Sequence, residues 1–166
     1  QFMVVSLVSH NEDRAVTRAN ADEVESLVKT FGGIVCANIA QNAARADDAT
    51  YIGTGKAHQL ADQAAVDEID VVVVNDNIRS SQLYALKSIF EQKKPDIHIW
   101  DRTDLILQIF EKHATTAEAK LQIQLANVRH KGTETRDINL SLSKQGSGVG
   151  SRGQGETNTV LLRRMW

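Results

Sequence analysis

The sequence predicts an α/β protein in which a small parallel β-sheet, flanked by helices, is followed by a long antiparallel helical hairpin with a glycine-rich tip. Three observations lead to this prediction. Short apolar runs alternate with helical stretches up to Asp101, the strand pattern fades beyond it, and five of the ten glycines fall within residues 146–155. We therefore expect an α/β subdomain at 1–101 and a helical hairpin subdomain at 102–166, with the glycine-rich loop at 146–155.

The first subdomain has the pattern of strands joined by helices. The run DVVVVND (70–76) is apolar without alternation, which is typical of a central strand covered on both faces. Connections of helical length between the strands imply parallel β-α-β units. Cys36 lies inside an apolar run and is expected to be a small buried core residue. The other expected strands are 3–8, 33–40 and 96–101, and the expected helices start after Asn20 or Ala21 and span 80–94, with Ser80 or Ser81 as the cap.

The second subdomain shows helical periodicity. An apolar seam recurs at spacings of three and four residues and lines one face of a long helix. Gly132 weakens a helix by about 1 kcal/mol relative to alanine, so a break near it is expected. Two helical arms joined by the glycine-rich loop then make an antiparallel hairpin. The seam consists of Ile106, Phe110, Ala114, Ala117, Leu121, Leu125 and Val128.

The overall net charge of −2 hides an asymmetry between the two parts. Residues 1–101 carry 9 Lys and Arg against 15 Asp and Glu, a net charge of −6, whereas residues 102–166 carry 10 against 6, a net charge of +4. A basic part of this kind is typical of a nucleic-acid surface, although a solvated helix face has the same composition. The asymmetry therefore predicts different partners for the two parts.

Two glycine patterns look like nucleotide-binding loops but lack the required context. Gly148, Gly150 and Gly153 have the G-x-G-x-x-G spacing, yet too few residues follow for a second strand and a ribose-binding acid. The pair Gly55-Lys56 lacks the glycine and hydroxyl residues that a P-loop needs around it. We expect neither loop to hold a nucleotide.

Composition argues against several other classes of protein. No run of 18 apolar residues and no leader pattern occurs, which predicts a cytoplasmic protein without a membrane span. A single cysteine excludes an internal disulfide, and the five histidines lack metal-ligand spacing along the sequence. No nucleophile with a neighbouring base can be identified. We therefore expect no catalytic residue, no metal and no cofactor in this chain.

Four segments resemble, in order, the N-terminal region of HflX, a family of ribosome-associated GTPases. The resemblance implies a parallel α/β subdomain followed by a helical hairpin. It also implies that the loop-bearing arm contacts RNA of the large ribosomal subunit near the peptidyl-transferase centre, in ribosome splitting or rescue and often under stress. The segments are YIGTGK (51–56), VVVVNDNIRSSQLYAL (71–86), IWDRTDLILQIFEKHATTAEAKLQIQLA (99–126) and SKQGSGVGSRGQGET (143–157).

The sequence also departs from the family pattern. Complete members continue into a GTPase domain, so the resemblance implies GTP and magnesium only for such a domain, which would be a partner in cis in a longer native chain. HKGTETRD (130–137) stands where relatives have a segment like YLLPRL, and ETNTVLLRR (156–164) stands in place of ETQLE-x-DRR.

The leading hypothesis is a binding module that docks on ribosomal RNA and has no catalytic role of its own. Lys and Arg provide most of the affinity for an RNA backbone, so basic residues of the second subdomain are the candidate contacts. The alternative for each of these basic residues is that it lies on a solvated helix surface and does not bind RNA. The resemblance favours Arg152 over the others. The candidate RNA-binding residues are Arg129, Lys131, Arg136, Lys144, Gly148, Gly150, Arg152 and Gly153.

Two other hypotheses stay open. The α/β subdomain could be a nucleotide-binding enzyme, because parallel sheets bind ligands at the carboxyl ends of their strands, here near Asn75–Asn77 and Asp101. Asn75–Asn77 is equally suited to capping the helix that follows it. The third hypothesis is a domain that regulates a GTPase domain in cis through the acidic surface of residues 1–101.

Overall fold

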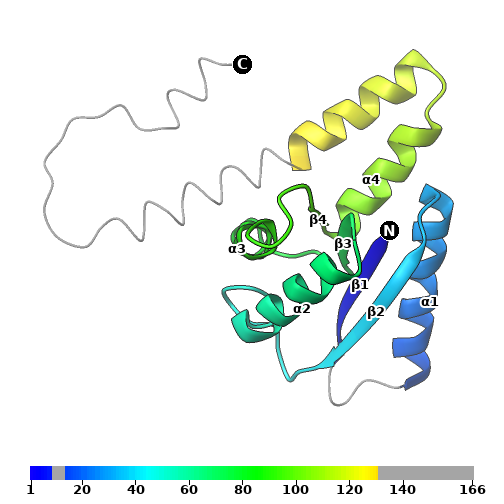
Figure 1. The fold of residues 1–166 in the computed structure, drawn as a ribbon. Coiled ribbons are helices and arrows are strands. Elements are labelled where there is room, and N and C mark those ends of the chain that lie inside the picture. Colours follow the sequence, from blue (N-terminus) through cyan, green and yellow to red (C-terminus); the bar gives the residue numbers. More distant parts are fainter. Residues whose placement is uncertain (9–13, 131–166) are drawn as a thin grey trace, which may run out of the picture.

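The computed structural model describes residues 1–8 and 14–130, which form a three-layer α/β unit (Figure 1). Strands and helices alternate along the chain, and residues 117–130 form one more helix that reaches the last described residue. The elements are β1 (Phe2–Val8), α1 (Arg14–Phe31), β2 (Val35–Asn42), α2 (Thr54–Val66), β3 (Val71–Val74), α3 (Ser80–Glu91), β4 (His98–Trp100) and α4 (Arg102–His113).

The four strands form a parallel sheet in the order β2-β1-β3-β4. Helices α1 and α4 cover one face, and α2 and α3 cover the other (Figure 1). All four valines of β3 are buried, because this strand lies between β1 and β4 with helices on both sides. The predictions of a parallel α/β fold and of a central strand within 70–76 are confirmed.

Alternate residues of β1 supply the two cores. Met3 and Val5 pack with α2 and α3, whereas Phe2 and Val4 pack with α1 and α4. The ring of Phe2 meets Phe31 and Trp100 edge to face, with centroids 5.7 and 5.8 Å away. This cluster explains the glycine at position 33, where a Cβ atom would lie 2.3 Å from Cε2 of Phe2.

Several predictions about individual elements are wrong. Helix α3 has Arg79 as its N-cap, in place of the predicted Ser80 or Ser81. Helix α1 begins at Arg14, well before the predicted start after Asn20 or Ala21. Cys36, predicted to be buried, is exposed. It lies on the edge strand β2 at the point where the register with β1 shifts between Phe2 and Met3, so that it has no regular partner on β1.

The predicted long helix is interrupted. Helix α4 ends at His113, and Ala114 leaves the helical conformation with ψ 117°. Thr116 then starts the next helix, because its hydroxyl oxygen accepts a hydrogen bond of 3.1 Å from the backbone N–H of Ala119. The first part of the predicted hairpin subdomain, up to residue 130, is described, but its second arm and its glycine-rich tip at 146–155 lie outside the described residues, so the antiparallel hairpin stays a prediction. None of the described helices is long and apolar enough to span a membrane.

Candidate functional site

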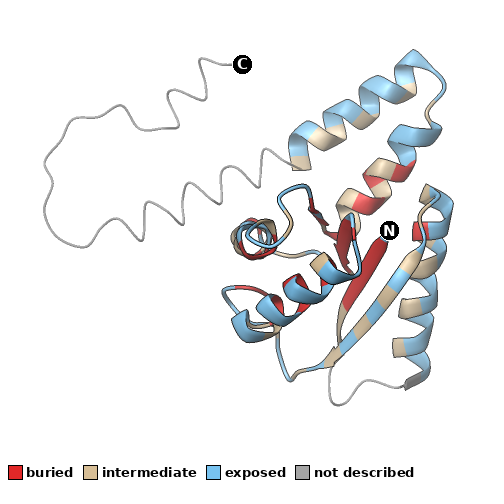
Figure 2. Ribbon diagram, viewed as in Figure 1, coloured by how far each residue is buried: buried red, intermediate tan, exposed pale blue. Residues whose placement is uncertain are grey.

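The helix of residues 117–130, here called the arm helix, carries the face that sequence analysis predicted to be apolar. Leu121, Leu125 and Val128 are 64%, 51% and 46% exposed, and Phe110 on α4 is 56% exposed. The more buried positions of the arm helix lie on another face, which includes Ile123 and the last described residue, His130. The large apolar residues of the predicted seam from Phe110 onward are therefore exposed within the described part of the chain, whereas Ile106 is partly buried (Figure 2).

The arm helix returns toward the beginning of α4. Nε2 of His130 lies 3.5 Å from Oδ1 of Asp101 and 3.5 Å from Oδ1 of Asp104. Asp101 is the N-cap of α4, and its Oδ1 accepts a hydrogen bond of 2.7 Å from the backbone N–H of Asp104. The Asp104 carboxylate reciprocates by accepting from the backbone N–H of Asp101 at 3.3 Å. Burial raises the pKa of the Asp101 carboxyl group, and the Asp104 carboxylate adds to this effect.

Of the predicted RNA contacts, Arg129 is within the described residues. It is exposed near the end of the arm helix, one residue before His130. The structure therefore does not test whether these residues come together. The predicted residues that lie outside the described part are Lys131, Arg136, Lys144, Gly148, Gly150, Arg152 and Gly153.

The carboxyl end of β3 was the alternative site considered from sequence. There Oδ1 of Asn75 accepts a hydrogen bond of 3.1 Å from Nη1 of Arg102. The same guanidinium group forms an ion pair with Glu23 of α1 and lowers the pKa of that carboxyl group. Asn75 thus belongs to a link that joins β3, α4 and α1.

The two residues that follow Asn75 are also engaged. Oδ2 of Asp76 accepts a hydrogen bond of 2.9 Å from the Tyr51 hydroxyl, and Oδ1 accepts one of 2.8 Å from the backbone N–H of Asn77. The Thr103 hydroxyl in turn donates to Oδ1 of Asn77 at 2.8 Å. These side chains hold neighbouring segments together, and Asp101 caps α4. The contacts favour a structural role of Asn75–Asn77 and Asp101 over nucleotide binding. The predicted capping of the next helix by Asn75–Asn77 is wrong, because the N-cap of α3 is Arg79.

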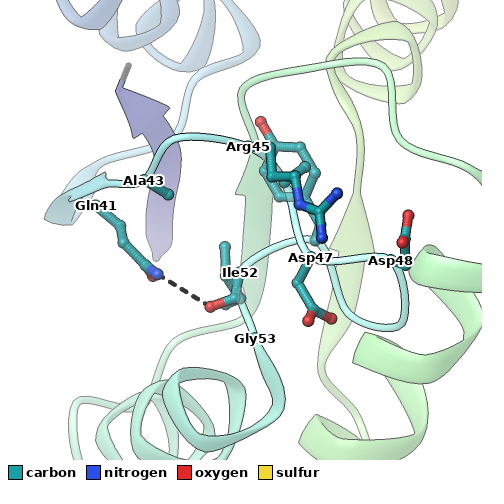
Figure 3. Close-up of a pocket in the computed structure, with 9 residues that line it drawn as sticks. Gln41, Ala43, Arg45, Asp47, Asp48, Ile52 and Gly53 are labelled. Carbon is teal, nitrogen blue, oxygen red and sulfur yellow. Dashed lines mark hydrogen bonds between the residues drawn. The ribbon is translucent and has the colours of Figure 1, made fainter. Parts of the chain in front are cut away.

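A pocket of about 320 Å³ opens beside the carboxyl end of β2 (Figure 3). Its acidic groups are used within the fold: Oδ1 of Asp47 accepts from the backbone N–H groups of Ala49 and Thr50 at 2.9 and 2.8 Å, and Asp48 pairs with Arg79 at 2.7 Å. The Gln41 amide donates to the Ile52 carbonyl at 3.1 Å. The pocket is lined by Gln41, Ala43, Arg45, Ala46, Asp47, Asp48, Tyr51, Ile52 and Gly53.

Sequence reasoning missed the linking roles of Tyr51 and Arg102. Tyr51 and Asp76 are 25 positions apart, and Arg102 and Glu23 are 79 apart, so no local pattern pairs them. The reciprocal cap of α4 did have a local signal, because an acid at Asp101 followed three residues later by Asp104 has the spacing of a capping box.

Comparisons with known proteins define the class and then the family. A family profile described as GTP-binding GTPase N-terminal matches residues 18–111, and one described as GTP-binding GTPase Middle Region matches residues 113–166. These matches make the chain the N-terminal and middle part of a GTP-binding GTPase. The chain belongs to the HflX family and corresponds to its N-terminal region.

Curated relatives show how much of such a protein the chain represents. It is 36% identical over 162 residues to a GTPase HflX of Alkalihalophilus pseudofirmus, covering 98% of this chain and 37% of the relative. It is 33% identical over 144 residues to the GTPase HflX of Escherichia coli, covering 86% of this chain and 32% of the relative. The chain thus spans about a third of the length of these relatives.

Solved structures agree with the fold. A GTP-binding protein from Sulfolobus solfataricus in complex with GDP superposes with a TM-score of 0.64 at 19% identity, covering 84% of this chain and 40% of that one. A G235P variant of SsGBP gives a TM-score of 0.65 at 20% identity, covering 84% and 42%. At these identities the likeness shows a shared fold.

Proposed function

We propose that this chain is the part of an HflX-type GTPase that docks on RNA of the large ribosomal subunit, in ribosome splitting or rescue in the cytoplasm. GTP and magnesium belong to a GTPase domain in cis, and the chain described here contributes binding. Family membership supports this proposal. The basic character of residues 102–166, with 10 Lys and Arg against 6 Asp and Glu, supports it as well.

The observation that carries the proposal is the composition of residues 144–156. Five glycines leave little side-chain bulk, which lets the backbone approach a crowded RNA surface and adopt positive φ where needed. Arg152 is the single charged residue between Lys144 and Glu156. Its planar guanidinium group can bind a phosphate with two hydrogen bonds or stack on an unpaired base.

The charge distribution predicts which part of the chain faces RNA. Residues 1–101 carry a net charge of −6, so a polyanionic RNA surface repels this part and attracts the basic part. Arg129, exposed near the end of the arm helix, adds positive charge just before the segment HKGTETRD (130–137). We infer that the chain approaches RNA with its second subdomain first.

Arg152→Ala is expected to weaken binding to purified large subunits by about 1–3 kcal/mol, the range for losing a hydrogen bond that involves a charged group. The melting temperature should stay nearly unchanged. Sedimentation with large subunits over a series of salt concentrations measures the change, because binding through phosphates weakens as salt rises. Glu68→Gln, at an exposed position of the acidic part, is the matched control.

The outcome decides between the proposal and its alternatives. Binding by the Arg152→Ala chain equal to that of the parent, under conditions where parent binding is salt-sensitive, would remove the glycine-rich segment as the contact. If the parent chain does not bind ribosomes but alters GTP hydrolysis by an added HflX GTPase domain, that result would support the regulatory role in cis instead.

A further inference from the structure

Three side chains that ligate metals well converge where the arm helix returns to the start of α4. The Nε2 atom of His130 is 3.5 Å from Oδ1 of Asp101 and 3.5 Å from Oδ1 of Asp104. The three ligand atoms all lie within 4.8 Å of one another. Two separate helices contribute them, so the group exists because of the tertiary fold and has no counterpart in a local sequence motif.

The spacing suits a shared cation. Zinc binds imidazole nitrogen and carboxylate oxygen at about 2.0–2.2 Å, so two ligands of a tetrahedral ion are about 3.4 Å apart. The two distances of 3.5 Å from His130 match that separation. They exceed the roughly 2.7–2.9 Å of a direct hydrogen bond between a charged nitrogen donor and a carboxylate.

Electrostatics also favours a cation here. The side chains of Asp101 and Asp104 are 4% and 13% exposed, and positive charge nearby stabilises two neighbouring carboxylates with so little solvent. The helix dipole places only about half a positive charge at the start of α4. This partial charge weakens the attraction for a cation, but it is too small to balance two carboxylates. A divalent ion would balance both.

The carboxylates are already oriented for ligation. Each accepts a backbone N–H group of the reciprocal cap, from Asp104 at 2.7 Å and from Asp101 at 3.3 Å. A carboxylate has about four acceptor positions, so these hydrogen bonds leave lone pairs for a metal. Outer-shell hydrogen bonds of this kind are what hold metal ligands in place in known sites.

We propose that Asp101, Asp104 and His130 bind one divalent transition-metal ion such as Zn²⁺, with water completing the coordination, and that this ion fastens the arm helix to the start of α4. The imidazole ligand selects Zn²⁺ over Mg²⁺ and Ca²⁺, which prefer oxygen ligands alone. The role of the ion is structural: it fixes the position of the arm helix relative to the α/β unit.

Calorimetric titration of the 166-residue chain with ZnCl₂ tests the proposal. The parent should bind about one Zn²⁺ per chain, and His130→Gln should weaken binding by at least about tenfold, since even outer-shell changes cost about 10–100-fold. Asp104→Asn should weaken it comparably while keeping an acceptor for the N–H group of Asp101. His58→Gln removes an exposed histidine elsewhere and should leave the affinity unchanged.

Hydrogen exchange supplies a second readout. Saturating Zn²⁺ should slow exchange of the amides in residues 117–130 of the parent and leave the His130→Gln chain unaffected. No saturable Zn²⁺ binding, equal affinity in parent and both variants, or equal affinity for Zn²⁺ and Mg²⁺ would each overturn the proposal. If circular dichroism shows that His130→Gln does not fold, Asp104→Asn decides. Exchange that changes with pH but not with Zn²⁺ would show an ion pair instead of a metal site.

Discussion

Tyr51 shows how one side chain ties distant segments together. The residue is 5% exposed, adopts a positive φ of 64°, and donates its hydroxyl hydrogen to Asp76 at 2.9 Å. Burial raises the pKa of its hydroxyl group, and the nearby Asp76 carboxylate raises it further. The loop before α2 is thereby fastened to the carboxyl end of β3.

Tyr51→Phe is expected to lower the free energy of unfolding by about 0.5–1.5 kcal/mol, the typical worth of one hydrogen bond. Urea denaturation at neutral pH measures this. The raised pKa means that the stabilisation is complete below about pH 10, the ordinary tyrosine value, and is lost as the pH rises through the higher folded-state pKa. The Phe chain should lack this alkaline loss. Identical alkaline curves for the two chains would contradict the assigned role.

Gly33 is a second residue whose identity the packing explains. Gly33→Ala would place a methyl group 2.3 Å from the ring of Phe2, which is held by Phe31 and Trp100, and should destabilise the fold by about 1–3 kcal/mol. Gly55→Ala is the control, because a Cβ atom there meets nothing within 4 Å. Thermal melting should give a lower melting temperature for Gly33→Ala than for Gly55→Ala. Equal melting temperatures would show that the contact between position 33 and Phe2 does not destabilise the fold.

The burial of some residues can be predicted from their neighbours in the sequence, whereas the burial of others cannot. The four valines of β3 were correctly predicted to be buried, because an unbroken apolar run needs a cover on both faces. Cys36 lies in a similar apolar run yet is exposed. Its environment depends on β2 being the edge strand and on a register shift against β1, and both are set by distant segments.

At the scale of elements, the break between α4 and the arm helix is the most instructive difference. The apolar spacing continues across residues 114–116, so periodicity alone predicts one helix. Capping residues indicate two: Lys112 and His113 end α4, where basic side chains suit the helix dipole, and Thr116 starts the arm helix. Local capping signals therefore take precedence over a periodic pattern at this position.

Thr116→Ala is expected to destabilise the arm helix by about 1 kcal/mol through loss of its N-cap. The effect should be local, appearing as faster hydrogen exchange in residues 117–130 with little change in the sheet. Thr115→Ala, one position earlier, is the control. Equal exchange in both variants would mean that the Thr116 cap does not hold the helix start.

At the scale of the whole molecule, local patterns were sufficient for the class of fold but not for the contacts between elements. Alternating apolar and helical segments predicted the parallel sheet, because β-α-β connections allow few other arrangements. Nothing local predicted that His130 would meet Asp101 and Asp104, or that Arg102 would bridge Asn75 and Glu23. Of the predicted RNA contacts, Arg129 alone is within the described residues, and the glycine-rich segment lies outside them.

Probes attached at two positions of the chain can test which part of it lies next to ribosomal RNA. The chain has one cysteine, the exposed Cys36 on β2, to which an iron chelate that cleaves nearby RNA can be attached directly. A second chain carrying Cys36→Ser and Ser151→Cys places the same chelate next to Arg152.

Mapping of RNA cleavage on purified large subunits then shows which of the two positions lies next to ribosomal RNA. We expect specific cuts from position 151 and few or none from Cys36, because in the docking proposal the basic second subdomain makes the contact and the acidic α/β part faces away. Cuts from Cys36 with none from position 151 would contradict the proposal that the glycine-rich segment binds ribosomal RNA.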